Sequence, residues 1–500
     1  MAKLTGGPQG VSLGPGYTIR TPGFTGTAEL SKPRPAAEIR RSRVPQDGTS
    51  AFDEALAATD VQEVQRVELT LKPMPAVAGT RSLRSADDRQ EEVELEVPDQ
   101  GDDTGVVVMA VDEAGVITWH LPEPDTAASQ PVTRGAGPTK RFRIPAPQPA
   151  APAPAAAGTR GLIGVIGRKI LKVLVYPLLD PVIGAISKHF AEKWETAKRP
   201  YGVRTFTPAE RKTPGAGAIT AADWDRLAAG RALLFIHGTF STAHSGFQQI
   251  PDDVFAKLHD RYGKRVIAFD HFTLSKSPRE NIDWLLSQVP AGRELEVDIV
   301  CHSRGGLVAR ALAERAGSPI KVRRVVFVAV PNGGTLLAHP DHMSKMLDRL
   351  TTALNLFPTG FVTETLEALI TGVKVLSHGA LGGLPGLAAM NPGGDFLKDF
   401  NSGMPVGDGY YGVAVDFEPT DQGLRALITG KVADAVLDRV FEDAANDLVV
   451  PELGVYSKNG SGAFPIPEAR LLRVPSGAGI IHTTVFGHPP VSERLLEWLG

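Results

Sequence analysis

LEVDIVCHSRGG, residues 295–306, joins a short apolar run to a serine with small residues on both sides. Residues 295–300 are typical of a buried strand, and the apolar residues that follow the two glycines are typical of a helix. In a sharp strand-to-helix turn the backbone folds back on itself, so the positions two before and two after the central residue must be small. Cys301 and Gly305 occupy these positions around Ser303. The pattern predicts a nucleophile elbow, and a turn whose serine only caps the helix is the alternative.

The surrounding sequence predicts a parallel α/β sheet. From about residue 200 onward, short apolar runs alternate with helical stretches. The stretch from about 336 to 405 lacks a clear strand and contains several apolar runs. An insertion of this size indicates a helical cap over the end of the sheet. Strands are predicted at 232–236, 265–270, 295–300, 325–330, 411–417 and 470–474.

A serine nucleophile needs a base that removes its proton and an acid that orients this base. In folds with a nucleophile elbow, the catalytic residues follow along the chain in the order Ser, Asp or Glu, His. Asp447 is the predicted acid, with Asp416 as its competitor at a strand end. His482 follows a flexible loop after the last strand and is the predicted base. His488 is the competing base, but it precedes Pro489 and Pro490, which stiffen the chain.

The tetrahedral intermediate also needs hydrogen-bond donors for its oxyanion. The first predicted strand of the sheet ends in His237-Gly-Thr-Phe240. One donor is predicted to be the backbone amide of Thr239, with Phe240 as the alternative. The second is the amide of Arg304, directly after the nucleophile. The guanidinium of Arg304 is expected to be exposed or held by a carboxylate.

These motifs resemble the α/β-hydrolase superfamily, and within it the lipase and esterase-like branch. The resemblance covers residues from about 230 to 500 and departs from the usual pattern at Cys301, where glycine is common. It implies that Ser303 is the nucleophile, Asp447 the acid and His482 the base. The motifs that carry it are FIHGTF, VCHSRGG, VAVPNGGTLLA, NDLVVP and IHTTVF.

The resemblance implies a serine hydrolase that cleaves a carboxylic ester through an acyl-enzyme, with a small-molecule or lipid-like substrate. An amide, peptide or thioester hydrolase with the same triad is an alternative. A non-catalytic interaction protein that uses the fold as a scaffold is another. No cofactor is expected. His339 and His342 with Asp341 resemble a metal motif, but such a loop is usually polar surface, so no metal is expected.

The N-terminal part has a different composition. Residues 1–60 are rich in Gly, Pro, Thr and Arg with little periodicity, which predicts disorder. Residues 61–145 show period-two alternation and predict a small β-sandwich-like domain, a candidate site for a protein partner. The Pro/Ala tract at 146–158 predicts a linker. Residues 159–199 are predicted to be helical and to pack against the next domain rather than on a membrane.

Composition excludes several classes. The 500-residue chain has a formal charge of -3, which provides no electrostatic attraction to nucleic acid. Membrane contact is not indicated. The single cysteine excludes an intramolecular disulfide, and the N-terminus has no apolar signal segment, so a cytoplasmic location is expected.

Overall fold

The computed structural model divides the chain into two compact units, and each is considered by itself. The β unit comprises Met1–Ile183, Leu347–Gly379 and Val432–Val440. The α/β unit comprises Gly184–Met346, Ala380–Lys431 and Phe441–Gly500. The structure describes residues 1–32, 61–74, 92–101, 103–112, 117–123, 138–145, 166–177, 186–335, 347–348, 351–352, 362–377, 384–403, 409–415, 452–458, 462–475 and 484–500.

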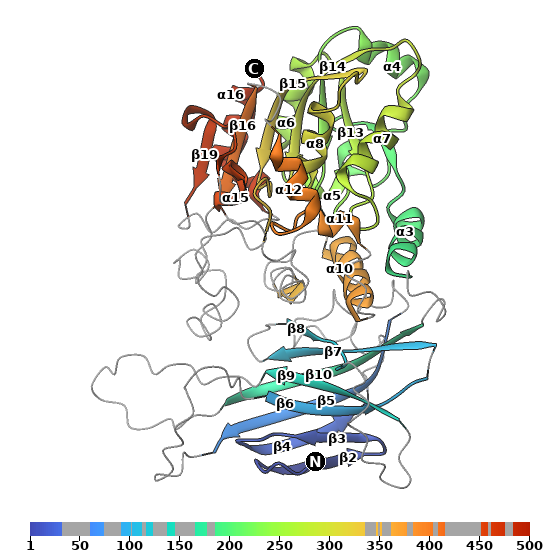
Figure 1. Ribbon diagram of the computed structural model, residues 1–500, viewed down its shortest axis with the longest axis vertical. Helices are drawn as coiled ribbons and strands as arrows, with labels where there is room; N and C mark the ends of the chain where they lie inside the picture. The colour runs from blue at the N-terminus through green and yellow to red at the C-terminus, as the bar shows by residue number, and fades with distance from the viewer. Residues whose placement is uncertain are drawn as a thin grey trace, which may run out of the picture. The chain divides into compact units, whose positions relative to one another are not determined.

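Two antiparallel sheets form most of the described β unit (Figure 1). The six-stranded sheet has the order β1-β4-β5-β10-β7-β8, and the four-stranded sheet has the order β2-β3-β6-β9. The strands are β1 (Ala2–Thr5), β2 (Val11–Gly14), β3 (Tyr17–Arg20), β4 (Phe24–Ser31), β5 (Gln62–Pro73), β6 (Glu92–Pro98), β7 (Thr104–Asp112), β8 (Ile117–His120), β9 (Thr139–Pro145) and β10 (Ile166–Pro177).

The two sheets share one hydrophobic core. Leu69 and Leu171 come from the larger sheet, and Leu95 and Phe142 come from the smaller one, all almost fully buried. Alternation along β6 places its valines and leucine inward and its glutamates outward. Arg20 on β3 pairs with two of these glutamates on the outer face. Burial of apolar side chains between the sheets therefore stabilises the unit, at about 1.5–3 kcal/mol for each large side chain.

β7 is buried on both faces. Every residue from Gly105 to Val111 is buried, whereas a strand with one solvated face alternates. Val108 and Ala110 belong to the core between the sheets. The helix α10 (Val362–Ser377) packs against β7 within the same unit. The run of apolar residues in β7 is thus explained by cover on two sides.

The predicted disorder of residues 1–60 is wrong for residues 1–32, which contain β1 to β4. These strands are short, and turns at Gly16 and Gly23, both with positive φ, connect them. β3 pairs with β6 and β4 pairs with β5, so their partners lie far along the chain. Long-range pairing of this kind leaves little local periodicity. Residues 33–60 lie outside the described residues.

The predicted helical structure of residues 159–199 is wrong over Ile166–Pro177, because this segment is the strand β10. β10 lies between β5 and β7 in the six-stranded sheet. Its lysines interrupt the apolar run but have partners: Lys169 Nζ donates to Pro145 O at 2.8 Å, and Lys172 Nζ lies 3.9 Å from Glu63 Oε2. A helix, α3 (Ile186–Lys198), does follow. The predicted linker at 146–158 lies outside the described residues.

The α/β unit contains a seven-stranded sheet of order β11-β13-β12-β14-β15-β16-β19 (Figure 1). β11 is antiparallel to its neighbour, and the remaining pairs are parallel. This confirms the prediction of a parallel α/β sheet. The strands are β11 (Gly202–Thr205), β12 (Ala232–Ile236), β13 (Val266–Asp270), β14 (Leu295–His302), β15 (Ile320–Val328), β16 (Tyr410–Val415) and β19 (Leu471–Val474).

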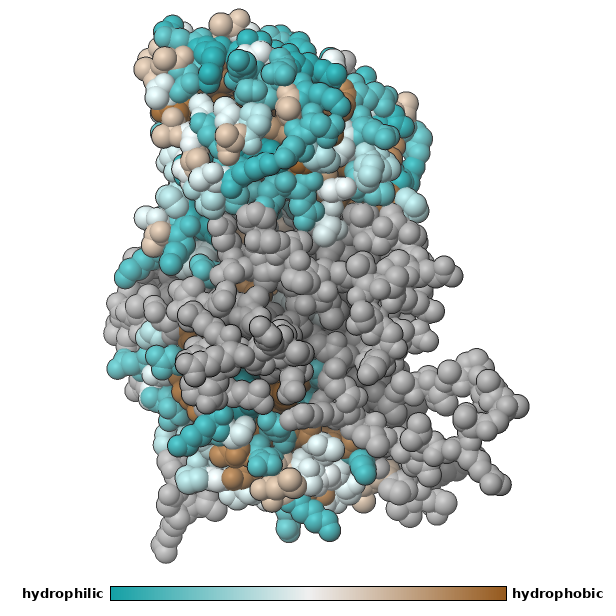
Figure 2. Space-filling view, turned by 180° about the vertical axis from the view of Figure 1, so that it is seen from behind, coloured by the Kyte–Doolittle hydropathy of each residue, from teal (hydrophilic) through white to brown (hydrophobic). Residues whose placement is uncertain are grey.

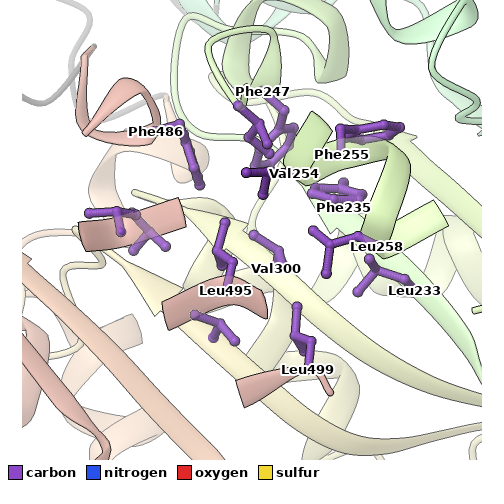
Figure 3. Close-up of a cluster of buried hydrophobic side chains, with 14 of the residues drawn as sticks. Leu233, Phe235, Phe247, Val254, Phe255, Leu258, Val300, Phe486, Leu495 and Leu499 are labelled. Atoms are coloured by element: carbon purple, nitrogen blue, oxygen red, sulfur yellow. The ribbon is translucent and has the colours of Figure 1, made fainter. Parts of the chain in front are cut away.

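Helices connect and cover these strands, as parallel pairing requires. Figure 3 shows Phe235 and Val300 from the sheet beside Phe247, Phe255 and Leu495 from helices, in one buried cluster. The helices besides α3 are α4 (Ala221–Ala228), α5 (Ala243–Phe247), α6 (Asp252–Arg261), α7 (Pro278–Gln288), α8 (Gly305–Ala313), α11 (Pro385–Ala388), α12 (Asp395–Ser402), α15 (Glu452–Tyr456) and α16 (Pro489–Trp498), with 3₁₀ turns at Glu210–Lys212, Glu468–Arg470 and Val485–Gly487 and a hairpin of β17 (Ser457–Lys458) and β18 (Gly462–Ala463).

On the face seen in Figure 2, the coloured residues are mostly hydrophilic. Among the residues that the structure describes, Met1 and Met74 are the exposed large hydrophobic side chains. Within the same residues, no helix has the length and apolar character needed to cross a membrane.

Candidate active site

Ser303 stands between β14 and α8 in a left-handed backbone conformation, with φ of 51°. This region is unfavourable for residues other than glycine, so surrounding contacts must hold it. The Ser303 amide donates to Val328 O on the neighbouring strand β15 at 3.0 Å. Because strand, strained residue and helix follow one another directly, the segment has the geometry of a nucleophile elbow.

The small residues around Ser303 are required by close packing. A Cβ on Gly305 would lie 2.4 Å from the carbonyl oxygens of both Ile236 and His237, so no side chain fits there. Cys301 is fully buried, and its Sγ contacts Val326 O at 3.4 Å. Burial raises the pKa of this thiol well above its usual value, which disfavours the reactive thiolate. Cys301 is thus a buried filler of the elbow.

The end of β12 lies directly beside Ser303. A Cβ on Gly238 would be 2.7 Å from the Ser303 Cβ, so the turn at Gly238-Thr239-Phe240 borders the nucleophile. Within the described part of the chain, the backbone amides of Thr239 and Arg304 donate to no backbone or side-chain acceptor. Free amides on both sides of a serine are the donors that an oxyanion hole requires.

His237 supports this turn and was not singled out as a functional residue by the sequence. Its ring is buried, with Nδ1 2.9 Å from Gly238 O and Nε2 3.2 Å from the His271 amide nitrogen. Since the amide of His271 is a donor, Nε2 accepts and Nδ1 carries the proton. Burial lowers the pKa of His237 to about 4, so the ring is neutral near pH 7. The histidine before the glycine was the available sequence signal.

The remaining predicted site residues are not in the described residues. These are Asp447, His482 and the competitor Asp416, together with residues 339–342, at which no metal was expected. The competing base His488 is described: it is half-buried and precedes the first turn of α16, where its carbonyl accepts from the Val491 amide at 3.0 Å. Within the described residues, no group of three metal-ligating side chains occurs.

Phe486, near the start of the described segment 484–500, lies beside the elbow. Its ring centroid lies 5.6 Å from that of His302, the residue before Ser303. It also packs against Phe247 at 5.2 Å.

A family model described as a domain of unknown function, DUF7379, matches residues 198–500. The chain belongs to the DUF7379 family. The matched range contains the whole seven-stranded sheet and the elbow. No curated protein matches the sequence.

Several solved structures are similar to part of this chain. A lipase from Bacillus licheniformis in mature form has 17% identity over 53% of this chain and 91% of its own, with a TM-score of 0.29. Lipase 1 from Pelosinus fermentans has 12% identity over 53% and 98%, with a TM-score of 0.35. A hydrolase from Oleispira antarctica has 11% identity over 62% and 97%, with a TM-score of 0.34.

The fold assignment rests on the sheet and the elbow. The sheet is parallel apart from β11 at one edge, and the strained serine follows β14 in its interior. The turn that ends β12 faces this serine from the adjacent strand. These features are those of the α/β-hydrolase fold.

Proposed function

We propose that this protein is a serine hydrolase that cleaves a carboxylic ester through an acyl-enzyme. The observation that carries the proposal is the strained, buried Ser303 with the free amides of Thr239 and Arg304 beside it. In an α/β-hydrolase this arrangement serves acyl transfer. The names of the similar structures, two lipases and a hydrolase, agree with this reaction class.

The mechanism assigns each group one role. Ser303 Oγ attacks the acyl carbon while His482 removes its proton, and Asp447 orients the imidazole. The amides of Thr239 and Arg304 stabilise the oxyanion. His482 then gives the proton to the leaving alcohol, and water releases the acid from the acyl-enzyme. The position of Phe486 beside His302 supports a base from the preceding residues.

The inserted residues 336–405 are proposed to govern substrate size. Their described part in the α/β unit includes α11, and Met390 just beyond it lies 3.8 Å (Sδ) from Thr239 Oγ1. A segment in contact with the oxyanion turn is suited to contact a bound acyl chain. A small-molecule or lipid-like ester is the proposed substrate.

Labelling with a fluorophosphonate probe tests the proposal without knowledge of the substrate. We expect the wild-type protein to be labelled and to hydrolyse short p-nitrophenyl esters, and Ser303→Ala to lose both while keeping its melting temperature. The loss of turnover should be several orders of magnitude, roughly 10³-fold or more. A folded wild-type protein without labelling would favour the scaffold alternative.

The same assay separates the two candidate bases. His482→Ala should lower kcat by about 10³-fold or more, whereas His488→Ala should lower it by less than about tenfold. The reason is that His488 stands at the start of α16, where the following prolines fix the chain. If His488→Ala is the inactive variant at an unchanged melting temperature, the assignment of His482 is wrong.

A further inference from the structure

The guanidinium of Arg304 is completely buried directly after the nucleophile. Its Nε donates to Gly386 O at 2.8 Å, and its Nη2 donates to Lys276 O at 2.5 Å. Burial of a cation is unfavourable unless hydrogen bonds and a counter-charge compensate. The side chain therefore has specific partners, and these two acceptors are backbone oxygens rather than the carboxylate that the sequence suggested as one option.

A counter-charge is nevertheless present in Glu195 on α3, which is also buried. Its Oε1 accepts from the amides of Thr273 and Leu274 at 2.5 and 2.8 Å. Its Oε2 accepts from the amide and hydroxyl of Ser275 at 3.0 and 2.6 Å. All these partners donate, which favours the ionised carboxylate, whereas burial raises the pKa of Glu195 above its ordinary value. Burial lowers the pKa of Arg304 to about 10, and the charge of Glu195 acts in the opposite direction.

Arg304 links two segments that are already pressed together. The loop 272–276 is held by Glu195 from one side. On the other side α11 lies so close that a Cβ on Gly386 would be 2.2 Å from Thr273 O. The Gly386 amide donates to Leu274 O at 2.9 Å. The guanidinium binds one carbonyl from each segment and so connects both to the residue next to Ser303.

The segment after α11 reaches the oxyanion turn. The carbonyl of Met390 accepts from the Thr335 amide at 2.9 Å. Its Sδ lies 3.8 Å from Thr239 Oγ1, within reach of a weak hydrogen bond to sulfur. Contacts thus run from Arg304 through α11 and Met390 to Thr239, whose amide is one proposed oxyanion donor.

We propose that Arg304, with Glu195 as its counter-charge, is a positioning residue that holds α11 and Met390 against the oxyanion turn. Its side chain touches no reacting atom, and its effect passes through Thr239. The proposal rests on the proposed serine hydrolase function. Because an oxyanion donor acts in the transition state, a misplaced Thr239 should reduce kcat more than it raises KM.

Arg304→Met removes the guanidinium while keeping the backbone amide, and Arg310→Met is its matched control. Arg310 lies on α8, which begins directly after Arg304, is equally buried, and donates to Asn401 Oδ1 at 2.9 Å rather than to α11 or the 272–276 loop. The concentration of reactive serine is titrated with the fluorophosphonate probe, and kcat for a short p-nitrophenyl ester is expressed per labelled serine. This normalisation removes the effect of a merely lower folded fraction.

We expect Arg304→Met to lower kcat per labelled serine by about 10- to 100-fold, with KM changed less than about threefold. Arg310→Met should lower the melting temperature but leave kcat per labelled serine within about threefold of wild type. A folded Arg304→Met variant with wild-type kcat per labelled serine would overturn the proposal. If that variant does not fold, Arg304→Lys is measured in the same way, and an unchanged kcat there overturns it as well.

The counter-charge is tested by adding Glu195→Gln. Glu195→Gln removes one of two acceptor oxygens and should lower the melting temperature in both backgrounds, but by less in Arg304→Met than in wild type, because there the cation that the carboxylate opposes is already gone. The kcat of the double variant should stay low, since the bonds to Gly386 and Lys276 are still missing. An equal decrease in melting temperature in the two backgrounds would overturn the assigned role of Glu195.

Hydrogen exchange separates this proposal from the proposed function. In Arg304→Met, the amides of residues 387–390 should exchange faster than in wild type, whereas Arg310→Met should leave them unchanged. A wild-type protein that neither reacts with the probe nor cleaves esters would refute the hydrolase. Faster exchange at 387–390 would still support the positioning role, and unchanged exchange would overturn it.

Discussion

His237 and His271 show how burial determines the charge of side chains near Ser303. Both rings are buried and stacked, with centroids 4.2 Å apart. Burial lowers the pKa of His237 to about 4 and that of His271 well below its ordinary value. In the unfolded chain each titrates near 6.5. Between about pH 4 and 6.5 the unfolded state therefore binds more protons, and stability falls as the pH falls.

The free energy of unfolding of the α/β unit should decrease by up to about 1.4 kcal/mol per pH unit for each of these histidines below about pH 6.5. His237→Gln keeps a donor for Gly238 O and an acceptor for the His271 amide but does not titrate. Urea unfolding at several pH values between about 5 and 7 measures the slope. In the variant, the change of unfolding free energy with pH should be smaller by the contribution of one histidine, up to about 1.4 kcal/mol per pH unit. An unchanged slope would contradict the buried neutral state of His237.

The elbow is the element that the sequence predicted best. Its strand and helix lie where the apolar runs predicted them. Gly305 packs so closely against backbone carbonyl oxygens that a larger residue would clash with them. The periodic runs also located the buried strands β12 to β16 of the sheet. These signals are local, because the apolar residues that indicate a strand buried on both faces are contained in the sequence of that strand.

Gly305→Ala tests the packing of the elbow. The new Cβ would lie 2.4 Å from Ile236 O and His237 O, so α8 or the end of β12 must shift. We expect a loss of about 1–3 kcal/mol in stability, which corresponds to a drop of several degrees in melting temperature. Gly403→Ala is the control, since a Cβ there meets nothing within 4 Å. Equal melting temperatures for the two variants would refute the close approach.

At the scale of the whole molecule, the insertion is divided between the units. Residues around α10 belong to the β unit, whereas α11 and α12 belong to the α/β unit. In the β unit, the insertion covers β8, the edge strand of the six-stranded sheet. Thr352 Oγ1 accepts from the Ile117 amide and donates to the Ile117 carbonyl, both at 3.0 Å. One side chain thereby satisfies backbone groups that a further strand would otherwise pair.

Thr352→Val should expose this dependence, because valine has the same shape but no hydroxyl. Both backbone groups of Ile117 would then be buried without this partner, at about 1–3 kcal/mol for each unsatisfied group. Hydrogen exchange should accelerate at Ile117 and at Trp119, whose amide donates to Asp348 Oδ1. Thr70→Val, at an exposed position of β5, is the control and should change stability by less than about 0.5 kcal/mol. Unchanged exchange at Ile117 in Thr352→Val would show that the hydroxyl does not hold the edge.

The sequence by itself determined the parallel sheet, the elbow at Ser303 and the turn at Thr239. Each depends on residue types at fixed spacing within a short stretch. Such a local pattern predicts the same local structure at any position in a chain. The assignments of Asp447 and His482 rest on chain order and on the family resemblance. They stay predictions.

Tertiary structure alone decided the β-unit pairing of residues 2–31, the central position of β10 and the buried contacts of Arg304. A short strand becomes a strand because a partner distant in sequence completes its hydrogen bonds. The lysines of β10 and the guanidinium of Arg304 are tolerated because remote carbonyls and carboxylates satisfy them. Such partners are brought together by folding, and no local pattern in the chain contains them.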